Sequence, residues 1–284
     1  MKLSHPGADI FVPDANVSVE AALARTTHLG IGAHQDDLEI MAYHGIAECF
    51  GRTDRWFSGV VVTDGAKSPR SGAYAAYTDE QIKDVRRAEQ RKAAAMGEYS
   101  IQIQLGHSAE SAKEPDNADV PADLRAIFSA ARAEVVYLHQ PGDKHDAHIA
   151  VLAHSLAALR ALPVADRPKR VLGCEVWRDL DWMCDAEKQA LDVSAHPKLA
   201  AALIAVFDSQ VSGGKRYDLA TVGRRLAHAT YHEALATDRS PALTWAMDLT
   251  PLVQDPTLSV RDYTRACIDR FRQDVEERLG KYFS

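Results

Sequence analysis

The sequence predicts an α/β fold in which helices flank a mostly parallel sheet, with a helical extension at the C-terminal end. Three observations support this prediction. Up to Trp177, short apolar runs of strand length alternate with longer segments that have helical spacing. The apolar runs end at polar or turn-forming residues, and after Trp177 the pattern becomes mostly helical. Strands that alternate with helices indicate βαβ units, in which neighbouring strands run parallel.

The first strand–helix–strand unit is expected between residues 29 and 63. Leu29 to Ala33 is a short apolar run, and helical spacing follows from Ile40 to Phe50. The β-branched run from Phe57 to Thr63 stops at the turn-forming pair Asp64-Gly65. We therefore predict a strand, a helix and a second strand in this order.

A long amphipathic helix is predicted from Thr78 to Met96, a segment that is charged and rich in alanine. Thr78 is a suitable N-cap for this helix, and Gly97 is a candidate C-cap. The remaining predicted strands lie at 101–105, 135–138 and 170–177, and the remaining helices at 121–133, 145–162, 197–207 and 261–279. The pattern indicates a Rossmann-like sheet, in which ligands bind beyond the carboxyl ends of the strands.

Length and charge restrict the class of protein. The 284 residues suffice for one α/β domain, and no Gly/Ser-rich or Pro-rich linker divides them. We expect a single domain over residues 1–284, with a core at about 26–180 and a C-terminal elaboration at about 181–284. The net charge of −7 comes from well-mixed acidic and basic residues, which argues against a nucleic-acid-binding protein.

Composition also predicts the compartment. No stretch has the roughly 18 uninterrupted apolar residues of a membrane span, and Met1 to Phe11 lacks the features of a secretory signal. The four cysteines lie far apart and form no CxxC pair, as expected for thiols in a reducing compartment. We therefore expect a cytoplasmic protein, whereas the oligomeric state is not predicted.

The first motif that can carry chemistry is AHQDDLE, at Ala33 to Glu39. It places His34, Asp36 and Asp37 at a predicted strand-to-helix turn. Neighbouring side chains leave such a turn in different directions, so one carboxylate can bind a metal with His34 while the other acts on a metal-bound water. Acidic residues are also common at helix N-termini, so this motif alone does not distinguish a metal site from helix capping.

The second motif, between His139 and His148, follows the strand predicted at 135–138. His145 and His148 are three residues apart, which places both on one face of an opening helical turn. His148 can supply a third metal ligand and His145 an acid or electrophile, while Asp143 can orient the imidazole of His145. A His/Asp/His site with a free Asp and a free His is a complete set of groups for hydrolysis.

Together the two motifs resemble those of the LmbE/PIG-L family of zinc-dependent N-acetylglucosaminyl deacetylases. That family has an early A-H-P-D-D-x-E motif and a later H-x-x-H motif preceded by Asp, which stand here as AHQDDLE and DKHDAH. Thr63-Asp64-Gly65 and Arg86-Arg-Ala-Glu89 also resemble intermediate elements of the family. The resemblance covers roughly the first 180 residues and continues more loosely from Ser209-Gln210 to Glu233.

The resemblance implies a reaction and a role for each matched residue. His34, Asp37 and His148 would bind Zn²⁺, although iron, cobalt or manganese also suit such ligands. Asp36 would be the base that activates a zinc-bound water, and His145 the general acid or transition-state stabiliser. The implied reaction releases acetate from a small-molecule amino sugar of the N-acetylglucosamine type.

Two positions depart from the family pattern. Gln35 replaces the usual Pro, and Asp146-Ala147 replaces the usual Pro-Asp between the two histidines. The carboxylate that normally precedes the last ligand is therefore missing. Asp143 or Asp146 is expected to orient His145 instead, and the sequence does not decide between them.

Three other functions are compatible with parts of the sequence. Gly30-x-Gly32 suggests a dinucleotide-binding oxidoreductase, but Gln35 stands where a third glycine is needed and a carboxylate pair would repel a pyrophosphate. An amidase that acts on another amide-linked amino-sugar conjugate would use the same groups. A non-catalytic sugar-binding protein with the same fold is the third alternative.

The C-terminal region contains weaker signals for substrate contacts. Lys215-Arg216-Tyr217 and Arg224-Arg225 form a basic stretch that could contact a phosphate or carboxylate, although a solvated helix face is the commoner role of such a stretch. Trp177 and Trp182 could offer a face for stacking on a sugar, although tryptophan more often packs in a core. Tyr231 and Glu233 resemble a late Y-x-E element of the family, which suggests a contribution to pocket closure.

Overall fold

The computed structural model describes residues 1–283, and within them eight strands form one sheet. The strands are β1 (Asp9–Phe11), β2 (His28–Gly32), β3 (Phe57–Thr63), β4 (Gln102–His107), β5 (Val135–His139), β6 (Arg170–Cys174), β7 (Gln189–Asp192) and β8 (Leu243–Asp248). Their order across the sheet is β1-β4-β3-β2-β5-β6-β8-β7. The central strands β4, β3, β2, β5 and β6 are parallel to one another, whereas β1, β8 and β7 pair antiparallel. The predicted mostly parallel α/β sheet is therefore confirmed.

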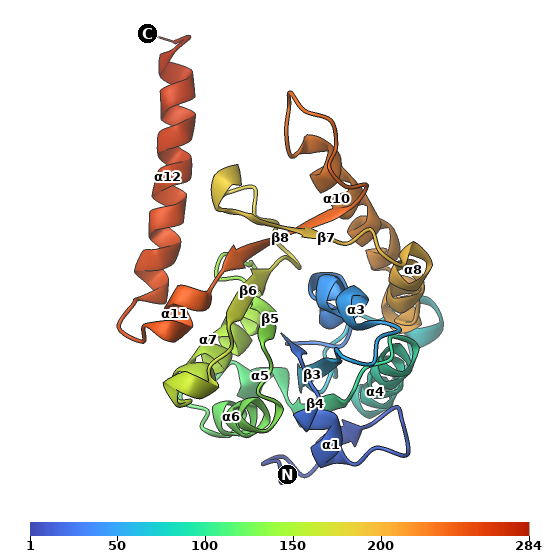
Figure 1. Ribbon diagram of the computed structural model, residues 1–284. Helices are drawn as coiled ribbons and strands as arrows, with labels where there is room; N and C mark the ends of the chain where they lie inside the picture. Colours follow the sequence, from blue (N-terminus) through green and yellow to red (C-terminus); the bar gives the residue numbers. More distant parts are fainter. Residues whose placement is uncertain (284) are drawn as a thin grey trace.

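Helices cover the sheet and form most of the C-terminal region (Figure 1). The N-terminal and central helices are α1 (Val19–Ala24), α2 (Asp37–Met41), α3 (Tyr43–Cys49), α4 (Asp79–Met96), α5 (Ala109–Ala112), α6 (Asp119–Ala131) and α7 (Asp146–Arg160). The C-terminal helices are α8 (Pro197–Ala205), α9 (Asp208–Val211), α10 (Tyr217–Tyr231), α11 (Thr250–Gln254) and α12 (Val260–Gly280). None of the helices within residues 1–283 combines the length and the apolar character that a membrane crossing requires.

The predicted elements agree with the structure except at a few positions. β3 spans the predicted residues, and α4 begins after a capping box in which Thr78 and Gln81 exchange hydrogen bonds. The single helix expected at 40–50 is divided at Ala42 into α2 and α3, and α2 begins earlier, at Asp37. The C-terminal extension is helical as predicted but also contributes β7 and β8, which the sequence analysis did not anticipate.

β8 links the C-terminal region to the rest of the sheet. It pairs directly with β6, so that Leu172 lies opposite Asp248 and Cys174 opposite Ala246. The C-terminal residues thus continue the sheet of the first 180 residues. The proposal that the chain is a single domain rests on this pairing.

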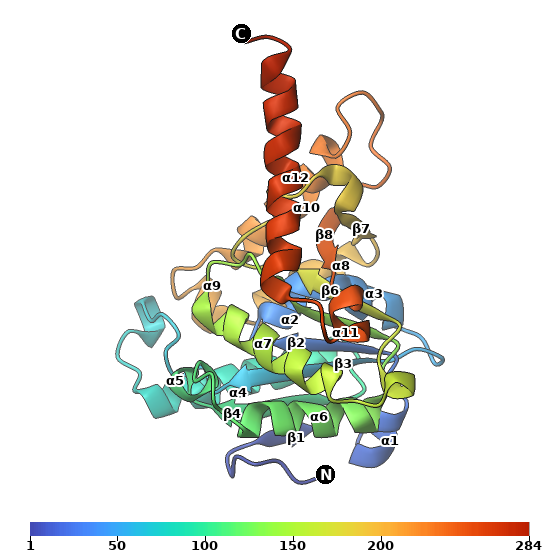
Figure 2. The ribbon, with the colours of Figure 1, turned by 90° about the vertical axis from the view of Figure 1, so that its left-hand side faces the viewer.

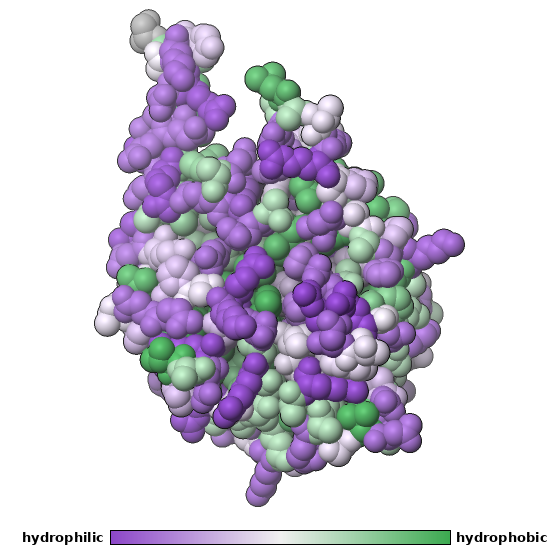
Figure 3. All heavy atoms as spheres, viewed as in Figure 1, coloured by the Kyte–Doolittle hydropathy of each residue, from purple (hydrophilic) through white to green (hydrophobic). Residues whose placement is uncertain are grey.

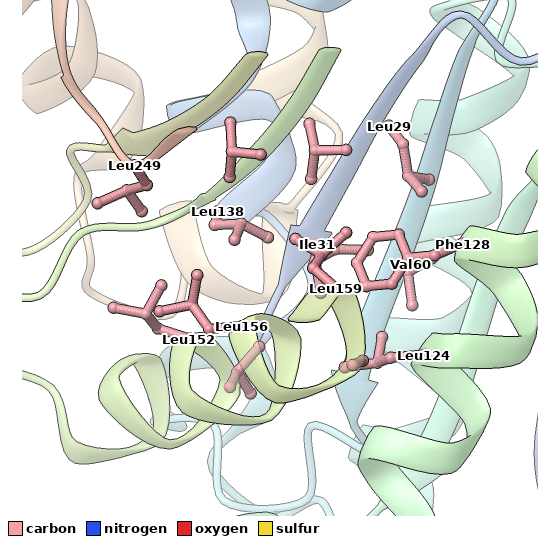
Figure 4. Packing of buried hydrophobic residues seen from close by; sticks show 14 of the residues in the cluster. Leu29, Ile31, Val60, Leu124, Phe128, Leu138, Leu152, Leu156, Leu159 and Leu249 are labelled. Carbon is pink, nitrogen blue, oxygen red and sulfur yellow. The ribbon is translucent and has the colours of Figure 1, made fainter. Parts of the chain in front are cut away.

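Alternate residues of the central strands pack on opposite faces of the sheet, as expected for strands buried on both sides. On β2 and β3, Leu29, Ile31 and Val60 face the cluster that α6 and α7 cover (Figure 4). Val61 and Tyr137 face the other cluster, which α2, α3 and α8 cover. The two layers of helices fix the sheet, and with it the positions of the loops at its carboxyl edge.

α12 extends away from the remainder of the molecule, and its C-terminal end projects beyond it in both views (Figures 1 and 2). Only Cys267 of this helix is buried. Ion pairs between residues of the helix itself, such as Arg272 with Glu276 and Arg278 with Asp274, occupy its outer half. Hydrophilic side chains predominate over α12 on the face seen in Figure 3.

Candidate active site

The two motifs meet where the strand order reverses. β2 lies between β3 and β5, so the chain after β2 and the chain after β5 leave the sheet side by side at its carboxyl edge. This is the position at which parallel α/β sheets bind ligands. A cavity of about 590 Å³ opens there. Its wall includes His34, Asp36, Asp37, Ser68, Pro69, Arg86, His145, Trp177, Lys215, Tyr217 and Arg224.

The turn between β2 and α2 holds the first motif in a strained conformation. Asp36 has φ 87° and ψ −27°, in the left-handed region that residues with a side chain adopt rarely. Gln35, which replaces the family's proline, is buried and donates from Nε2 to the carbonyl of Thr63 at 3.1 Å. The Asp36 amide donates to Gln90 Oε1 at 3.2 Å. These bonds hold the turn so that Asp36 and Asp37 point in different directions.

Three side-chain atoms of the predicted ligand set lie at the corners of a nearly regular triangle. His34 Nδ1 is 3.3 Å from Asp37 Oδ2, His148 Nε2 is 3.4 Å from Asp37 Oδ2, and the two ring nitrogens are 3.2 Å apart. Metal bonds of about 2.0–2.1 Å at tetrahedral angles separate neighbouring ligand atoms by about 3.3–3.4 Å. The triangle therefore has the dimensions of one face of a tetrahedral zinc site, and the residues fit such an ion.

Asp143 fixes the ring of His148. Its Oδ2 lies 3.2 Å from His148 Nδ1, and the same oxygen accepts the amide of Trp177 at 3.2 Å. When Nδ1 carries the proton and donates it to Asp143, the lone pair of Nε2 faces His34 and Asp37. Burial lowers the pKa of His148 to about 4, so the ring is neutral and able to bind a metal near pH 7.

Asp143 orients a different imidazole from the one predicted, His148 instead of His145. Asp143 Oδ1 accepts a hydrogen bond from the backbone amide of His145 at 3.1 Å. Its other oxygen, Oδ2, contacts the ring of His148 and orients it. Asp146 is exposed. The His145 ring is instead held by the backbone, because its Nδ1 accepts the amide of Ala147 at 3.3 Å. A short N-capping interaction thus replaces the carboxylate that the sequence lacks.

His145 borders the cavity next to the three candidate ligands. Its ring centre lies 4.8 Å from that of His34 and 4.7 Å from that of His148. Burial, assisted by the neighbouring His34, lowers the pKa of His145, which favours the neutral ring. Because Nδ1 accepts a hydrogen bond, the neutral ring carries its proton on Nε2, and this N–H is available to a ligand.

Asp36 belongs to a buried network that the sequence analysis did not assemble. Arg86 Nη2 donates to Asp36 Oδ2 at 2.9 Å, and Arg86 Nη1 donates to Glu89 Oε2 at 3.3 Å. Glu89 accepts both the amide and the hydroxyl of Ser209, each at 2.7 Å. The network therefore joins the turn after β2 to α4 and to α9, residues that are far apart in the sequence.

The two adjacent carboxylates have different electrostatic environments. Burial raises the pKa of Asp36 to about 6, although Arg86 opposes this shift. Burial also acts to raise the pKa of Asp37, but His148, His139 and His34 outweigh it and lower the pKa well below its usual value. Asp37 is thus held ionised, the state that a metal ligand requires, whereas Asp36 is the carboxylate suited to exchange a proton near neutral pH.

His139 is a buried residue of the site for which the sequence analysis gave no role. The amide of Ala33 donates to its Nε2 at 2.9 Å, and its ring stacks on that of His148 with centres 3.9 Å apart. His139, Asp143 and His148 also form a group with metal-binding atoms. His139 and Asp143 do not line the cavity, however, and the Ala33 amide uses the Nε2 lone pair of His139. The triangle of His34, Asp37 and His148 is therefore the better candidate metal site.

Of the remaining residues that the sequence suggested for substrate contacts, some line the cavity and others do not. Trp177, Tyr217 and Arg224 line the cavity, as does Ser68 in the segment between β3 and α4. Neither Trp182 nor the pair Tyr231 and Glu233 does so, and Tyr231 is 84% exposed, so the suggestion that this pair closes the pocket is wrong.

The glycines of Gly30-x-Gly32 serve packing. A Cβ on Gly30 would lie 2.8 Å from Leu38, so glycine lets α2 approach β2 closely. The first candidate ligands, His34 and Asp37, occupy the following turn. The structure thus gives these glycines a role that needs no dinucleotide.

Comparison with known proteins agrees with this arrangement. Residues 29–159 match the PIG-L family, described as GlcNAc-PI de-N-acetylase. No curated protein sequence matches the chain.

Several solved structures share the fold. The 4-carboxy-2-hydroxymuconate hydratase GalB of Pseudomonas putida is 18% identical, with a TM-score of 0.61 over 79% of this chain and 96% of the hydratase. A conserved protein of Thermus thermophilus is 18% identical, with a TM-score of 0.57 over 82% of this chain and 99% of that protein. The N,N'-diacetylchitobiose deacetylase of Pyrococcus horikoshii is 14% identical, with a TM-score of 0.57 over 78% of this chain and 83% of the deacetylase. At these identities the likeness establishes the fold. The segment 29–159, which contains both motifs, is a domain of the PIG-L family.

Proposed function

We propose that the protein is a metal-dependent hydrolase that removes the N-acetyl group from an N-acetylglucosamine-type substrate. The observation that carries this proposal is the triangle of His34, Asp37 and His148 beside a cavity that Asp36 and His145 also line. The arrangement combines a metal site, a proton acceptor and a hydrogen-bond donor within one cavity of the size that small molecules occupy.

The donor set suits zinc. Two neutral imidazoles and one carboxylate are a common zinc ligand set, and a fourth position is left for water or substrate. A bound zinc ion supplies Lewis acidity and lowers the pKa of water to about 7. We propose zinc on the dimensions of the triangle, with about one ion per chain.

The protein residues have separate tasks in the proposed reaction. Asp36 accepts a proton from the water whose oxygen attacks the acetamide carbonyl carbon. The Nε2–H of His145 donates a hydrogen bond to the carbonyl oxygen, which becomes negatively charged as the new C–O bond forms. The C–N bond then breaks, the proton held by Asp36 passes to the amine nitrogen, and the products are acetate and the amino sugar.

The environment of Asp36 fits this task. A carboxylate with a pKa of about 6 is ionised at pH 7 and is a stronger base than an ordinary aspartate. Arg86, with Nη2 at 2.9 Å, holds the carboxylate in place throughout the reaction. A reducing, cytoplasmic location is also part of the proposal, since Cys49, Cys174, Cys184 and Cys267 are all free thiols.

Acetate release tests the proposal. The zinc-loaded protein is incubated with N-acetylglucosamine derivatives, and free acetate and new primary amines are measured with and without a chelator. We expect both products in equal amounts and only without the chelator. If the protein binds metal but releases acetate from none of the derivatives, deacetylation is contradicted. Other amides would then be tested, and so would the addition of water, the reaction of the hydratase with the same fold.

A further inference from the structure

Two cationic side chains line the candidate active-site cavity at some distance from the metal ligands. Lys215 lies in the segment between α9 and α10, and Arg224 lies on α10. Both contact the same short segment after β6. Lys215 Nζ is 4.9 Å from the ring centre of Trp177, and Arg224 Nη1 donates to the carbonyl of Val176 at 2.6 Å.

Neither cation forms an ion pair with a carboxylate within residues 1–283, and their side chains contact Trp177 and the Val176 carbonyl instead. Of the other cations that line the cavity, Arg86 and Lys67 form ion pairs, whereas Lys113, at the end of α5, has no carboxylate partner among the described residues either. Arg86 is paired with Asp36, and Lys67 with Asp79. Arg216, which is adjacent to Lys215 but does not line the cavity, is paired with Asp218. In a chain with a net charge of −7, two unpaired cations on one cavity wall indicate that a ligand supplies the negative charge.

Arg224 is positioned to bind an anion. Its bond to the Val176 carbonyl uses one guanidinium nitrogen and fixes the direction of the side chain, while the other N–H groups remain available. A guanidinium with free N–H groups binds carboxylate and phosphate oxygens through charge-assisted hydrogen bonds. Lys215, held over Trp177, adds a second positive charge beside it.

Trp177 connects this cationic pair with the reaction centre. Its ring centre lies 6.0 Å from that of His145, which borders the candidate metal site, and Lys215 lies against the same ring. Tyr217 packs edge-on against Trp177, with ring centres 6.2 Å apart. The cations are therefore one aromatic ring away from the group that is cleaved, which is within reach of a substituent on the same sugar or on its aglycone.

We infer that the substrate is an N-acylated amino sugar with an anionic substituent, a carboxylate or a phosphate, which Lys215 and Arg224 bind beside Trp177. This inference rests on the proposed deacetylation, since it assigns the substrate class of that reaction. It separates the cavity into a reaction centre built by the two motifs and an anion subsite built by the C-terminal region.

The test compares charged with neutral substrates. Acetate release by the zinc-loaded, full-length protein is measured for N-acetylglucosamine, its 1-phosphate and 6-phosphate, and N-acetylmuramic acid, which carries a carboxylate. We expect kcat/KM for at least one anionic substrate to exceed that for N-acetylglucosamine by tenfold or more. The preferred compound distinguishes phosphate from carboxylate. A neutral substrate that is cleaved as well as all the charged ones would overturn the inference.

Variants show whether the two cations cause the preference. In Lys215→Met and Arg224→Gln, the ratio of kcat/KM for the anionic over the neutral substrate is expected to fall about tenfold, mainly through KM. Arg216→Met is the matched control and should keep the wild-type ratio, because its side chain is paired outside the cavity. An unchanged ratio in both cavity variants would contradict the assignment.

A binding measurement separates this inference from the proposed function. If no derivative releases acetate, deacetylation fails, and the subsite is then tested by calorimetric titration of the zinc-loaded protein with N-acetylglucosamine 6-phosphate and N-acetylmuramic acid. Tighter binding of one of them to the wild type than to Lys215→Met or Arg224→Gln supports the subsite. The subsite is overturned if the wild type and both variants bind these compounds with equal affinity, or if none of the three proteins binds them.

Discussion

Single hydrogen bonds decide which ring nitrogen carries the proton in two imidazoles of the site, His145 and His148. Asp143 accepts from Nδ1 of His148, which leaves Nε2 free as a ligand. The Ala147 amide donates to Nδ1 of His145, which leaves the proton of the neutral ring on Nε2. Two histidines three residues apart thus present opposite groups to the cavity, a lone pair and an N–H. This difference fits the two roles proposed for the motif, metal binding by His148 and transition-state stabilisation by His145.

Asp143→Asn tests the role of Asp143. Loss of the negative charge beside His148 weakens the donor strength of Nε2, so we expect zinc affinity to fall by about 10–100-fold. Zinc affinity is measured by competition with a chromophoric chelator. Asp146→Asn, an exposed position of the same segment, is the control and should bind zinc like the wild type. Equal loss in both variants would mean a general disturbance of the segment rather than an effect on His148.

Asp36→Asn separates proton transfer from metal binding. The amide keeps the shape of the side chain and still accepts from Arg86, but it cannot take a proton from water. We expect acetate release to fall by about 10²–10⁴-fold while the zinc content stays at the wild-type value. Full activity in this variant would show that another group is the base.

The sequence was sufficient to find the residues of the site that lie within short motifs. His34, Asp37 and His148 come together because the fold places both motifs at one edge of the sheet. Partners that depend on distant contacts were not predictable. Nothing in the local sequence shows that Glu89 accepts from Ser209, 120 residues away, or that His139 stacks on His148.

At the scale of helices and strands, the sequence predicted the ends of a segment correctly where the residues at that end form a turn or a helix cap. β3 ends at the Asp64-Gly65 turn, and α4 begins at the Thr78 capping box. β8 could not be recognised because its residues, LTWAMD, are not typical of a strand and become one by pairing with β6 and β7. Likewise, the division between α2 and α3 at Ala42 has no glycine or proline to indicate it.

The Arg86–Glu89–Ser209 network holds α4 and α9 together, and Glu89→Gln tests it. The glutamine amide can accept only some of the hydrogen bonds that Glu89 accepts. It also removes a negative charge next to the buried guanidinium of Arg86. We expect the free energy of unfolding in urea to fall by about 2–3 kcal/mol. Glu80→Gln on the same helix is the control, since Glu80 is exposed and paired only with Lys83, and should leave the urea midpoint unchanged. A wild-type midpoint for Glu89→Gln would show that the network contributes little to stability.

At the scale of the whole molecule, the outer half of α12 stands apart from the cavity and from both apolar clusters (Figures 1 and 2). A chain that ends at Arg272 is therefore expected to release acetate at the wild-type rate. Its unfolding temperature should change by less than about 2 °C, because few contacts with the body are removed. Calorimetry and the acetate assay check this expectation, and a large loss of either property would show that this half of the helix supports the fold.

The central claim is that His34, Asp37 and His148 bind the metal on which hydrolysis depends. The most direct measurement is the metal content of the purified wild type and of His148→Ala, each assayed for chelator-sensitive acetate release. We predict about one zinc ion per chain and acetate release for the wild type, and little metal and no release for the variant. A His148→Ala protein that retains a full complement of zinc, or a wild type that releases acetate without any metal, would contradict this claim.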